Sequence, residues 1–342
     1  MGEFNPLERT VESAPDQTTD ERPVETNVDA FLNSLLSNPL PVAPAGFRSG
    51  FVGIVGRPNV GKSTLMNYLI GEKVAITSPV AQTTRNRLRG ILTTPEAQAI
   101  FVDTPGIHKP HHQLGKVLVK NARSAIHSVD VLLFVVDCSV EAGGGDRFIV
   151  NLLKSADVPV IVGLNKQDQQ DPKAAEAIDR SYADLAEPEG WPLLKFSALT
   201  GEEVPMLQQT LIDRLDSGPF YYPPDRVTDQ PERFIMGELI REQVLLLTRQ
   251  EVPHSVAIAI DWVEEEPKFT RIVATIHVER SSQKGILIGK GGQMLKAIGS
   301  AARQQIQKLI AGKVHLELFV KVQPKWRQSR IRLQELGYKV EE

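Results

Sequence analysis

A glycine-rich segment carries the residues best suited to bind a phosphate group. GRPNVGKST spans 56–64, follows an apolar run, precedes a helical pattern and fits G-x-x-x-x-G-K-[ST]. Glycines let main-chain N–H groups face phosphate oxygens, and the next helix adds its positive dipole end. We expect Lys62 to reach the β- and γ-phosphates and Ser63 to ligate Mg²⁺. The alternative, a plain glycine turn, is disfavoured by the strand–loop–helix context. The expected phosphate-binding residues are Gly56, Arg57, Pro58, Asn59, Val60, Gly61, Lys62, Ser63 and Thr64.

Two later segments can complete a magnesium and γ-phosphate site. In DTPG (103–106), the Asp103 carboxylate can hold the Mg²⁺ shell and the Gly106 N–H can meet a γ-phosphate, although DTPG alone is an ordinary turn. In QTTRNR (82–87), a threonine can close over the metal when GTP is bound, and we favour Thr84 over Thr83. The expected metal ligands are Ser63, Thr84 and Asp103. The two switch segments comprise Gln82, Thr83, Thr84, Arg85 and Asn86, and Asp103, Thr104, Pro105, Gly106 and Ile107.

Two further strand-end segments are suited to recognise guanine. Asp168 of NKQD can accept hydrogen bonds from the guanine N1–H and exocyclic amine, whereas adenine offers no matching donors. Asn165 either bonds the base edge or ties loops together, and the Lys166 stem covers the base face. In SALTG, we expect the Ala198 N–H to donate to the guanine O6. The expected base-binding residues are Asn165, Lys166, Gln167, Asp168, Ser197, Ala198 and Leu199.

The elements that must position these segments alternate between strand and helix. Short apolar runs at 51–56, 99–104, 129–139, 158–165 and 193–198 are separated mostly by stretches of helical character. This alternation predicts a mostly parallel α/β sheet with helices on both faces. Right-handed crossovers then bring the post-strand loops to one edge, where ligands bind in such sheets.

Composition is typical of a globular protein that carries its charge unevenly. The chain has 342 residues, a net charge of −3 and one cysteine, Cys138, which we expect to be a buried apolar residue in a reducing compartment. No apolar stretch approaches a membrane span. Residues 1–48 hold eight acidic and three basic side chains, which predicts a disordered acidic extension and disfavours a signal or transit peptide.

A second domain follows a proline-rich linker. Residues 217–231 hold four prolines, and 232–342 predict a helix, two strands, a helix–loop–helix, a strand and a last helix over 325–337. Residues 280–332 carry twelve Lys or Arg and one acidic residue, which favours a polyanionic partner over a merely solvated face.

A G-x-x-G loop in this second domain is suited to clamp a nucleic-acid backbone. We expect Lys290 to add charge and Ile288, Leu295 and Ile298 to line an apolar groove, while Trp326 is better explained as a packing residue than as a flank of that groove. The flanking Arg327, Arg330 and Arg332 are candidates for the groove edge. The expected RNA-binding residues are Ile288, Gly289, Lys290, Gly291, Gly292 and Lys296.

The segments GRPNVGKSTLMN, AQTTRNRLRGI, DTPGIHKP and NKQD resemble the Era family of GTPases, over about residues 49–340. The resemblance implies an α/β P-loop GTPase domain over 49–216 and an α+β KH type 2 RNA-binding domain with a terminal helix over 232–342. It implies GTP hydrolysis to GDP, binding of 16S-type ribosomal RNA near its 3′ end, and a role in assembly of the small (30S-type) subunit. A cytoplasmic monomer is expected, and its basic C-terminal face can also attract anionic lipid on the inner face of the membrane.

The resemblance also leaves the catalytic step open. Ile107 stands where related GTPases place a water-orienting glutamine, so no side-chain base is assigned and Lys62 is the expected charge stabiliser. We expect slow hydrolysis that depends on a partner, and the alternative is an RNA-binding scaffold with negligible hydrolysis. Asn59 matches an asparagine that ligates K⁺ in related enzymes, with a plain loop asparagine as the equal alternative.

Overall fold

The structure, a computed structural model, describes residues 40–78, 88–104, 106, 126–248, 252–310 and 312–336. The chain divides into two units, Met1–Leu40 and Pro41–Glu342, and every element named below belongs to the second. The first expected switch segment, Pro105, Ile107 and nearly all of the acidic extension lie outside the described residues. The domain limits expected from the sequence stay predictions.

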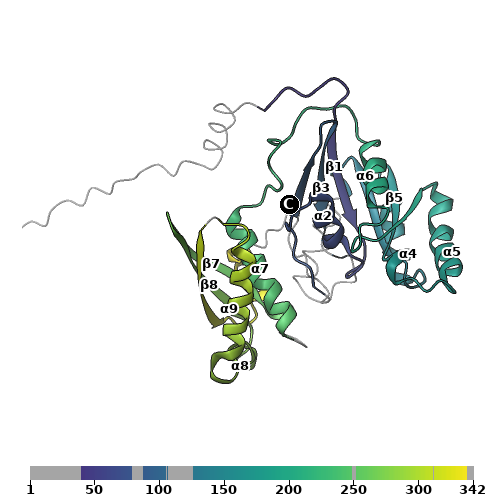
Figure 1. Cartoon of the computed structure of the whole chain (residues 1–342). Helices are drawn as coiled ribbons and strands as arrows, with labels where there is room; N and C mark the ends of the chain where they lie inside the picture. Colours follow the sequence, from purple (N-terminus) through teal and green to yellow (C-terminus); the bar gives the residue numbers. More distant parts are fainter. Residues whose placement is uncertain are drawn as a thin grey trace, which may run out of the picture. The chain divides into compact units, whose positions relative to one another are not determined.

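The first half of the second unit forms a six-stranded sheet in the order β2-β3-β1-β4-β5-β6 (Figure 1). The strands are β1 (Arg48–Val55), β2 (Leu88–Thr93), β3 (Ala97–Asp103), β4 (Val131–Asp137), β5 (Val160–Asn165) and β6 (Leu193–Phe196). Neighbouring strands pair in parallel except β2, which runs antiparallel to β3. The predicted mostly parallel sheet is confirmed, but β2 was not expected because its half-polar sequence lacks an apolar run.

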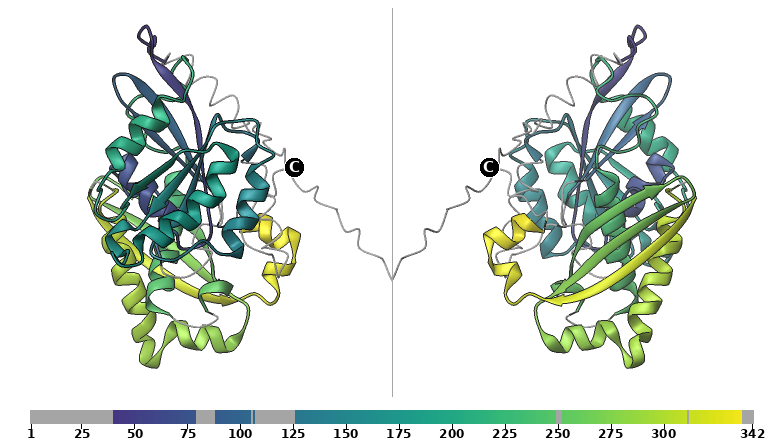
Figure 2. Two further views of the ribbon diagram at one scale, coloured as in Figure 1. Left: turned by 90° about the vertical axis from the view of Figure 1, so that its right-hand side faces the viewer. Right: turned by 90° about the vertical axis from the view of Figure 1, so that its left-hand side faces the viewer.

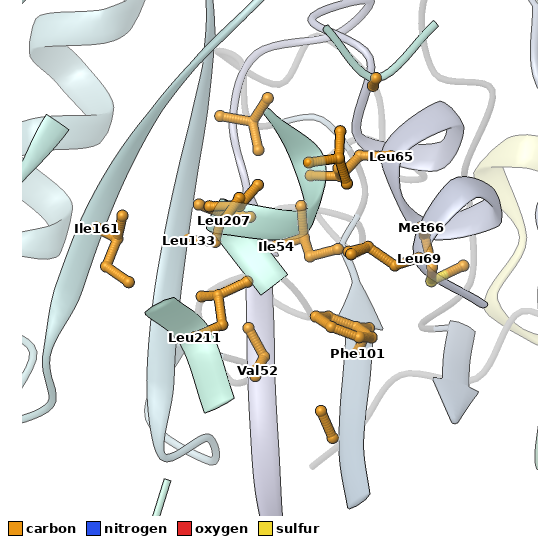
Figure 3. Close-up of a cluster of buried hydrophobic side chains, with 14 of the residues drawn as sticks. Val52, Ile54, Leu65, Met66, Leu69, Phe101, Leu133, Ile161, Leu207 and Leu211 are labelled. Carbon is orange, nitrogen blue, oxygen red and sulfur yellow. The ribbon is translucent and has the colours of Figure 1, made fainter. Parts of the chain in front are cut away.

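Helices cover both faces of this sheet. Helices α2 (Lys62–Ile70) and α6 (Val204–Ile212) pack on one face, and α4 (Gly144–Leu153) and α5 (Ala175–Ala186) pack on the other. Figure 3 shows the first of these two cores, in which Ile54 and Leu65 are fully buried. Each such side chain contributes about 1.5–3 kcal/mol by leaving water. Cys138 is buried in the strand-end loop, and burial raises the pKa of its thiol to about 11, so the expected packing role is supported.

The proline-rich segment 217–231 is held along the sheet. The Gln98 side chain accepts hydrogen bonds from the Tyr221 and Tyr222 N–H groups at 2.8 and 3.0 Å. The Ile91 N–H donates to the Val227 carbonyl at 2.8 Å. This segment therefore follows a fixed course beside β2 and β3 before the second domain begins.

The second domain contains a three-stranded sheet in the order β7-β8-β9 (Figure 2). Its elements are α7 (Glu232–Leu247), β7 (Ala257–Glu266), β8 (Phe269–Val278), α8 (Ser281–Ile288), α9 (Gln293–Ile306), β9 (Lys313–Val322) and α10 (Arg330–Glu335). Strands β7 and β8 are antiparallel, whereas β8 and β9 are parallel. Buried side chains of α7 and α9 pack on one face, including Ile240 and Ala302 against Ile272. The predicted element order is confirmed up to β9.

The predicted single helix over 325–337 is wrong. A 3-10 turn, Trp326–Gln328, is separated from α10 by Ser329, which has extended φ and ψ of −100° and 117°. The Ser329 hydroxyl accepts from the Arg332 N–H and so caps a new helix start. Trp326 is fully buried and its Nε1 donates to the Ser255 carbonyl at 3.0 Å, which confirms a packing residue. The Arg327 guanidinium pairs with Glu279, so that side chain is not a free edge of an RNA groove.

The segment that follows α2 contacts α7. Asn67 of α2 fixes this segment by accepting the N–H groups of residues 74 and 75 at 3.1 and 2.8 Å. Ile76 is buried in the core of the second domain. The buried Glu242 of α7 accepts the Thr77 N–H at 2.8 Å and pairs with the Lys73 ammonium at 2.5 Å. A continuous set of contacts therefore joins α2 to α7.

Within the part of the chain that the structure describes, no helix combines the length and the apolar character that crossing a membrane requires.

Candidate nucleotide and RNA sites

The loop 56–61 connects β1 to α2 and lies at the carboxyl edge of the parallel strands. Gly61 has a φ of 99°, and a Cβ there would lie 2.2 Å from Asn165 Nδ2. A Cβ at Gly56 would lie 2.3 Å from the Val135 carbonyl oxygen. Both positions therefore require glycine, as the phosphate-loop pattern predicts. Asn59 also adopts a left-handed conformation, with a φ of 64°.

Lys62 begins α2 with its side chain folded back on the loop. It is 6% exposed, and its ammonium donates to the carbonyls of Gly56 and Arg57 at 3.2 and 3.0 Å. Burial lowers the pKa of this ammonium, and the nearby charge of Asp103 partly opposes that shift. The Lys62 ammonium therefore lies inside the loop that is expected to bind phosphate.

Ser63 and Asp103 are brought together as the sequence predicts. The Ser63 hydroxyl donates to Asp103 Oδ2 at 2.8 Å, and Asp103 is fully buried at the end of β3. Hydroxyl and carboxylate oxygens are ligands that Mg²⁺ accepts, usually with few protein ligands and with phosphate completing its shell. Among the described residues, no group of three or more His, Cys, Asp or Glu could hold a metal ion. Thr104 donates its hydroxyl to the Ile54 carbonyl at 2.9 Å and so ties β3 to β1.

Asn165 joins the two loops that flank it. Its Nδ2 donates to the Val60 carbonyl at 2.7 Å, and its Oδ1 accepts the Ala198 N–H at 2.8 Å. Of the two roles expected for Asn165, the structure shows the one that ties loops together. The Ala198 N–H donates to Asn165 Oδ1 in this structure, and its expected contact with the guanine O6 stays a prediction.

The other residues expected to bind the base lie around Asn165. The Ser197 hydroxyl donates to Asp168 Oδ1 at 2.6 Å, which orients an otherwise exposed carboxylate. Gln167 is half-buried beside Asp168, and Leu199 is 70% exposed at the start of the next turn. The structure therefore gathers the NKQD and SALTG residues at one place on the sheet edge.

Asp137 is a site residue that the motifs did not predict. Its carboxylate pairs with the Lys166 ammonium at 2.5 Å. Burial alone would raise the pKa of this carboxyl, but hydrogen bonds from Lys166 and Ser139 outweigh it, and the pKa is lowered. The pair holds the Lys166 ammonium at the end of β4. The available signal was its place at the end of β4, on the same edge as Asp103 and Asn165.

The G-x-x-G loop of the second domain lies between α8 and α9. Gly289, Gly291 and Gly292 have φ values of 71°, 59° and 79°, so the loop needs glycine for its left-handed backbone. Lys290 is exposed within the turn, and Lys296 is exposed near the start of α9. The loop therefore presents two lysine side chains to solvent beside its glycines.

Ile298, which was expected to line the groove, lies in the core instead. Ile298 is fully buried in the core beneath α8 and α9, so it does not line an open groove. Its place on the inward face of α9 follows from helical periodicity. Ile288 and Leu295 are half-buried and stay candidates for the apolar side.

Comparison with known proteins finds two family models. Residues 51–166 match a family described as 50S ribosome-binding GTPase, and residues 251–327 match the KH domain. The first match covers most of β1 and all of β2 to β5 but ends before β6, and the second covers β7 to β9.

Similar whole proteins are also known. The chain is 72% identical to GTPase Era of Nostoc sp. over 317 residues, covering 92% of this chain and 98% of the relative. It is 70% identical to GTPase Era of Synechocystis sp., covering 89% and 96%.

Two crystal structures of Era proteins match with a TM-score of 0.82 and 39% identity, covering 85% of this chain and 99% of theirs. One is Era in complex with MgGDPNP and nucleotides 1506–1542 of 16S ribosomal RNA. The other is a variant of Aquifex aeolicus Era bound to GDP and aluminium fluoride.

High identity over nearly the full length, together with the shared GTPase and KH domains, shows that this chain belongs to the Era family of GTPases.

Proposed function

We propose that this Era-family GTPase holds GTP or GDP with Mg²⁺ at the carboxyl edge of the six-stranded sheet and hydrolyses GTP there. The carrying observation is the contact of Ser63 with Asp103 at 2.8 Å, directly beside the buried Lys62. These three groups are the hydroxyl, carboxylate and cation that a magnesium triphosphate requires. The related Era bound to MgGDPNP supports the same chemistry.

In this proposal, the loop N–H groups and Lys62 bind the phosphates. Lys62 leaves the carbonyls of Gly56 and Arg57 and donates to the β- and γ-phosphates, where its charge stabilises the transition state. Ser63 and Asp103 hold Mg²⁺, as does Thr84 from outside the described residues. When bound, Mg²⁺ neutralises developing phosphate charge. Gly106 offers its N–H to the γ-phosphate.

The base is selected by the NKQD and SALTG residues. Asp168, oriented by Ser197, accepts the guanine N1–H and amine. Lys166, fixed by Asp137, covers the base face. Asn165 holds the frame rather than contacting the base, and the Ala198 N–H reaches the guanine O6 only if it leaves Asn165.

No residue of the described chain is assigned as general base. We include K⁺ at Asn59 in the proposal because this residue of the phosphate loop matches the asparagine that ligates K⁺ in related enzymes. A K⁺ ion there would add positive charge near the β–γ bridge. Turnover that is the same in K⁺ and Na⁺ buffers would remove K⁺ from the proposal.

The second domain is proposed to bind small-subunit ribosomal RNA near its 3′ end, as the related Era does with its 16S fragment. Exposed Lys290 lies within, and exposed Lys296 near, a glycine turn whose backbone can approach phosphates closely. The protein would then act in assembly of the small ribosomal subunit as a cytoplasmic monomer. A peripheral contact of the basic face with anionic lipid is a secondary part of the proposal.

Nucleotide state is proposed to affect RNA binding through the joint between α2 and α7. The segment 73–77 leads directly into the expected first switch segment, and Glu242 fixes it to α7 by two contacts. A change in the switch on GTP binding would therefore pull on segment 73–77, which is already attached to the second domain.

Catalysis and the scaffold alternative are separated by a turnover assay. We expect the RNA 3′ end or small subunits to raise GTP turnover. Lys290→Ala should weaken this stimulation because it weakens RNA binding. In a plot of log affinity against log salt concentration, the variant should reduce the magnitude of the slope by about 1. Lys268→Ala, which removes an exposed lysine from the β7–β8 turn, is the matched control and should behave as wild type. Absence of turnover under every condition, with RNA bound, would favour the scaffold.

Base choice tests the NKQD assignment. Asp168→Asn should weaken GTP binding by about a hundred-fold or more, because the new amide can accept only one of the two guanine donors and its NH₂ meets the other. It should favour xanthosine triphosphate, whose base has a carbonyl acceptor in place of the guanine amine. Nucleotide affinities measured by fluorescence competition report the change. Asp171→Asn, three residues along and exposed, serves as the control. Unchanged GTP affinity in Asp168→Asn would show that another group reads the base.

The proposed coupling through the contacts between α2 and α7 is tested by RNA affinity in two nucleotide states. Wild type should bind RNA with different affinities in the GTP-analogue and GDP complexes. Glu242→Gln should reduce that difference, because it removes the ion pair with Lys73 while keeping side-chain size. Glu232→Gln, exposed on the first turn of the same helix, should keep the difference. Equal RNA affinities of the two nucleotide complexes in wild type would rule out the coupling. If Glu242→Gln keeps the full wild-type difference, the coupling does not pass through Glu242.

A further inference from the structure

The guanidinium of Arg57 belongs to the phosphate loop but is paired with a carboxylate outside it. Arg57 Nε lies 2.9 Å from Asp146 Oδ1, and the two side chains are 30% and 0% exposed. Asp146 lies in the first turn of α4, where the Gly143 N–H donates to its second oxygen at 2.9 Å. A carboxylate without solvent contact is stable only when it is paired, so this pair fixes the guanidinium.

Gly145, the residue before Asp146, makes room for the pair. A Cβ added to Gly145 would lie 2.7 Å from Arg57 Cδ. The arginine side chain therefore lies directly over Gly145, and a larger residue would push it away from Asp146. The approach of the phosphate loop explains this one glycine, whereas a Cβ at Gly143 would make only ordinary contacts and one at Gly144 would meet nothing within 4 Å.

The first turn of the loop is held at several points around Arg57. The Arg57 carbonyl accepts from Lys62 Nζ at 3.0 Å, so its position sets that of the ammonium. The next residue, Pro58, is so close to Gly106 that a Cβ there would lie 2.8 Å from the Pro58 nitrogen. Asp146 supplies the anchor on the side of α4, where the contacts of Lys62 and Gly106 do not reach.

We infer that Asp146 is a positioning residue for the phosphate loop, and that it acts through Arg57, whose side chain anchors the loop instead of binding phosphate. The inference rests on the proposed assignment of 56–64 to phosphate. Loss of the anchor lets the loop N–H groups and Lys62 shift, and small displacements of binding groups are costly. The base-reading residues lie on other loops and keep their contacts.

The test is a double-mutant cycle on the full-length protein with Asp146→Asn and Arg57→Met. Asp146→Asn keeps an oxygen for the Gly143 N–H and the side-chain shape but removes the charge. Each single variant should weaken GDP binding about ten- to a hundred-fold, and the double variant should be no weaker than either. GMP lacks the β-phosphate, so the ratio of GDP to GMP affinity, measured by competition, should fall in all three. A general folding defect would lower both affinities together.

Matched variants and a reference variant make each outcome decisive. Lys154 and Glu189 form an ion pair of 2.7 Å at the other end of α4, so Lys154→Met and Glu189→Gln should leave the ratio unchanged. The inference is overturned if Asp146→Asn keeps the wild-type ratio, or if Arg57→Met adds its full loss to that of Asp146→Asn. Lys62→Ala tests the underlying site: loss of GDP binding there with a normal Asp146→Asn rejects only the anchor, whereas wild-type GDP binding in Lys62→Ala rejects the phosphate site itself.

Discussion

The amide of Asn165 is the interaction on which the nucleotide site depends. It donates to the Val60 carbonyl and accepts the Ala198 N–H, so one side chain spans the loops that follow β1 and β6. Its approach also explains Gly61, where a Cβ would collide with Nδ2. Leaving either buried partner unsatisfied would cost about 1–3 kcal/mol. The loops for phosphate and for base are therefore held as one unit.

Around Asn165, the fold itself supplies partners for the charged groups of the site. Lys62 contacts loop carbonyls, Asp103 accepts from Ser63, and Asp137 pairs with Lys166. Groups that are already held in position need little reorganisation during a reaction, which is the basis of electrostatic preorganisation. In the proposed function, Lys62 is the exception, because it exchanges the loop carbonyls for phosphate oxygens. The main-chain N–H groups of the loop are then the donors that bind phosphate oxygens, so the loop is suited to an anion.

Much of this arrangement could be predicted from local sequence. Apolar runs located β1, β3, β4, β5 and β6, and the handedness of crossovers placed their loops on one edge, which brought Ser63 to Asp103 as expected. The failures involve pairings between distant residues. Asp137 and Lys166 are 29 positions apart, and neither has a local feature that identifies the other. The contact of the Ala198 N–H with Asn165 was likewise not expected, because these residues meet only in the folded loops.

The second domain shows the same limit. Helical periodicity and glycine content located α8, α9 and the turn between them, but the burial of Ile298 depends on which face of α9 meets the sheet. The break before α10 depends on one hydroxyl, since Ser329 caps a new helix instead of continuing the turn that contains Trp326. Single polar contacts of this kind override a pattern that otherwise favours a continuous helix.

The most direct test of the account is calorimetric titration of Asn165→Ala with GDP and Mg²⁺, beside wild type and with thermal unfolding of both. The account predicts that wild type binds GDP, and that Asn165→Ala remains folded but binds far more weakly, because the phosphate and base loops separate. Wild-type affinity in folded Asn165→Ala would contradict the claim that this amide holds the nucleotide site together.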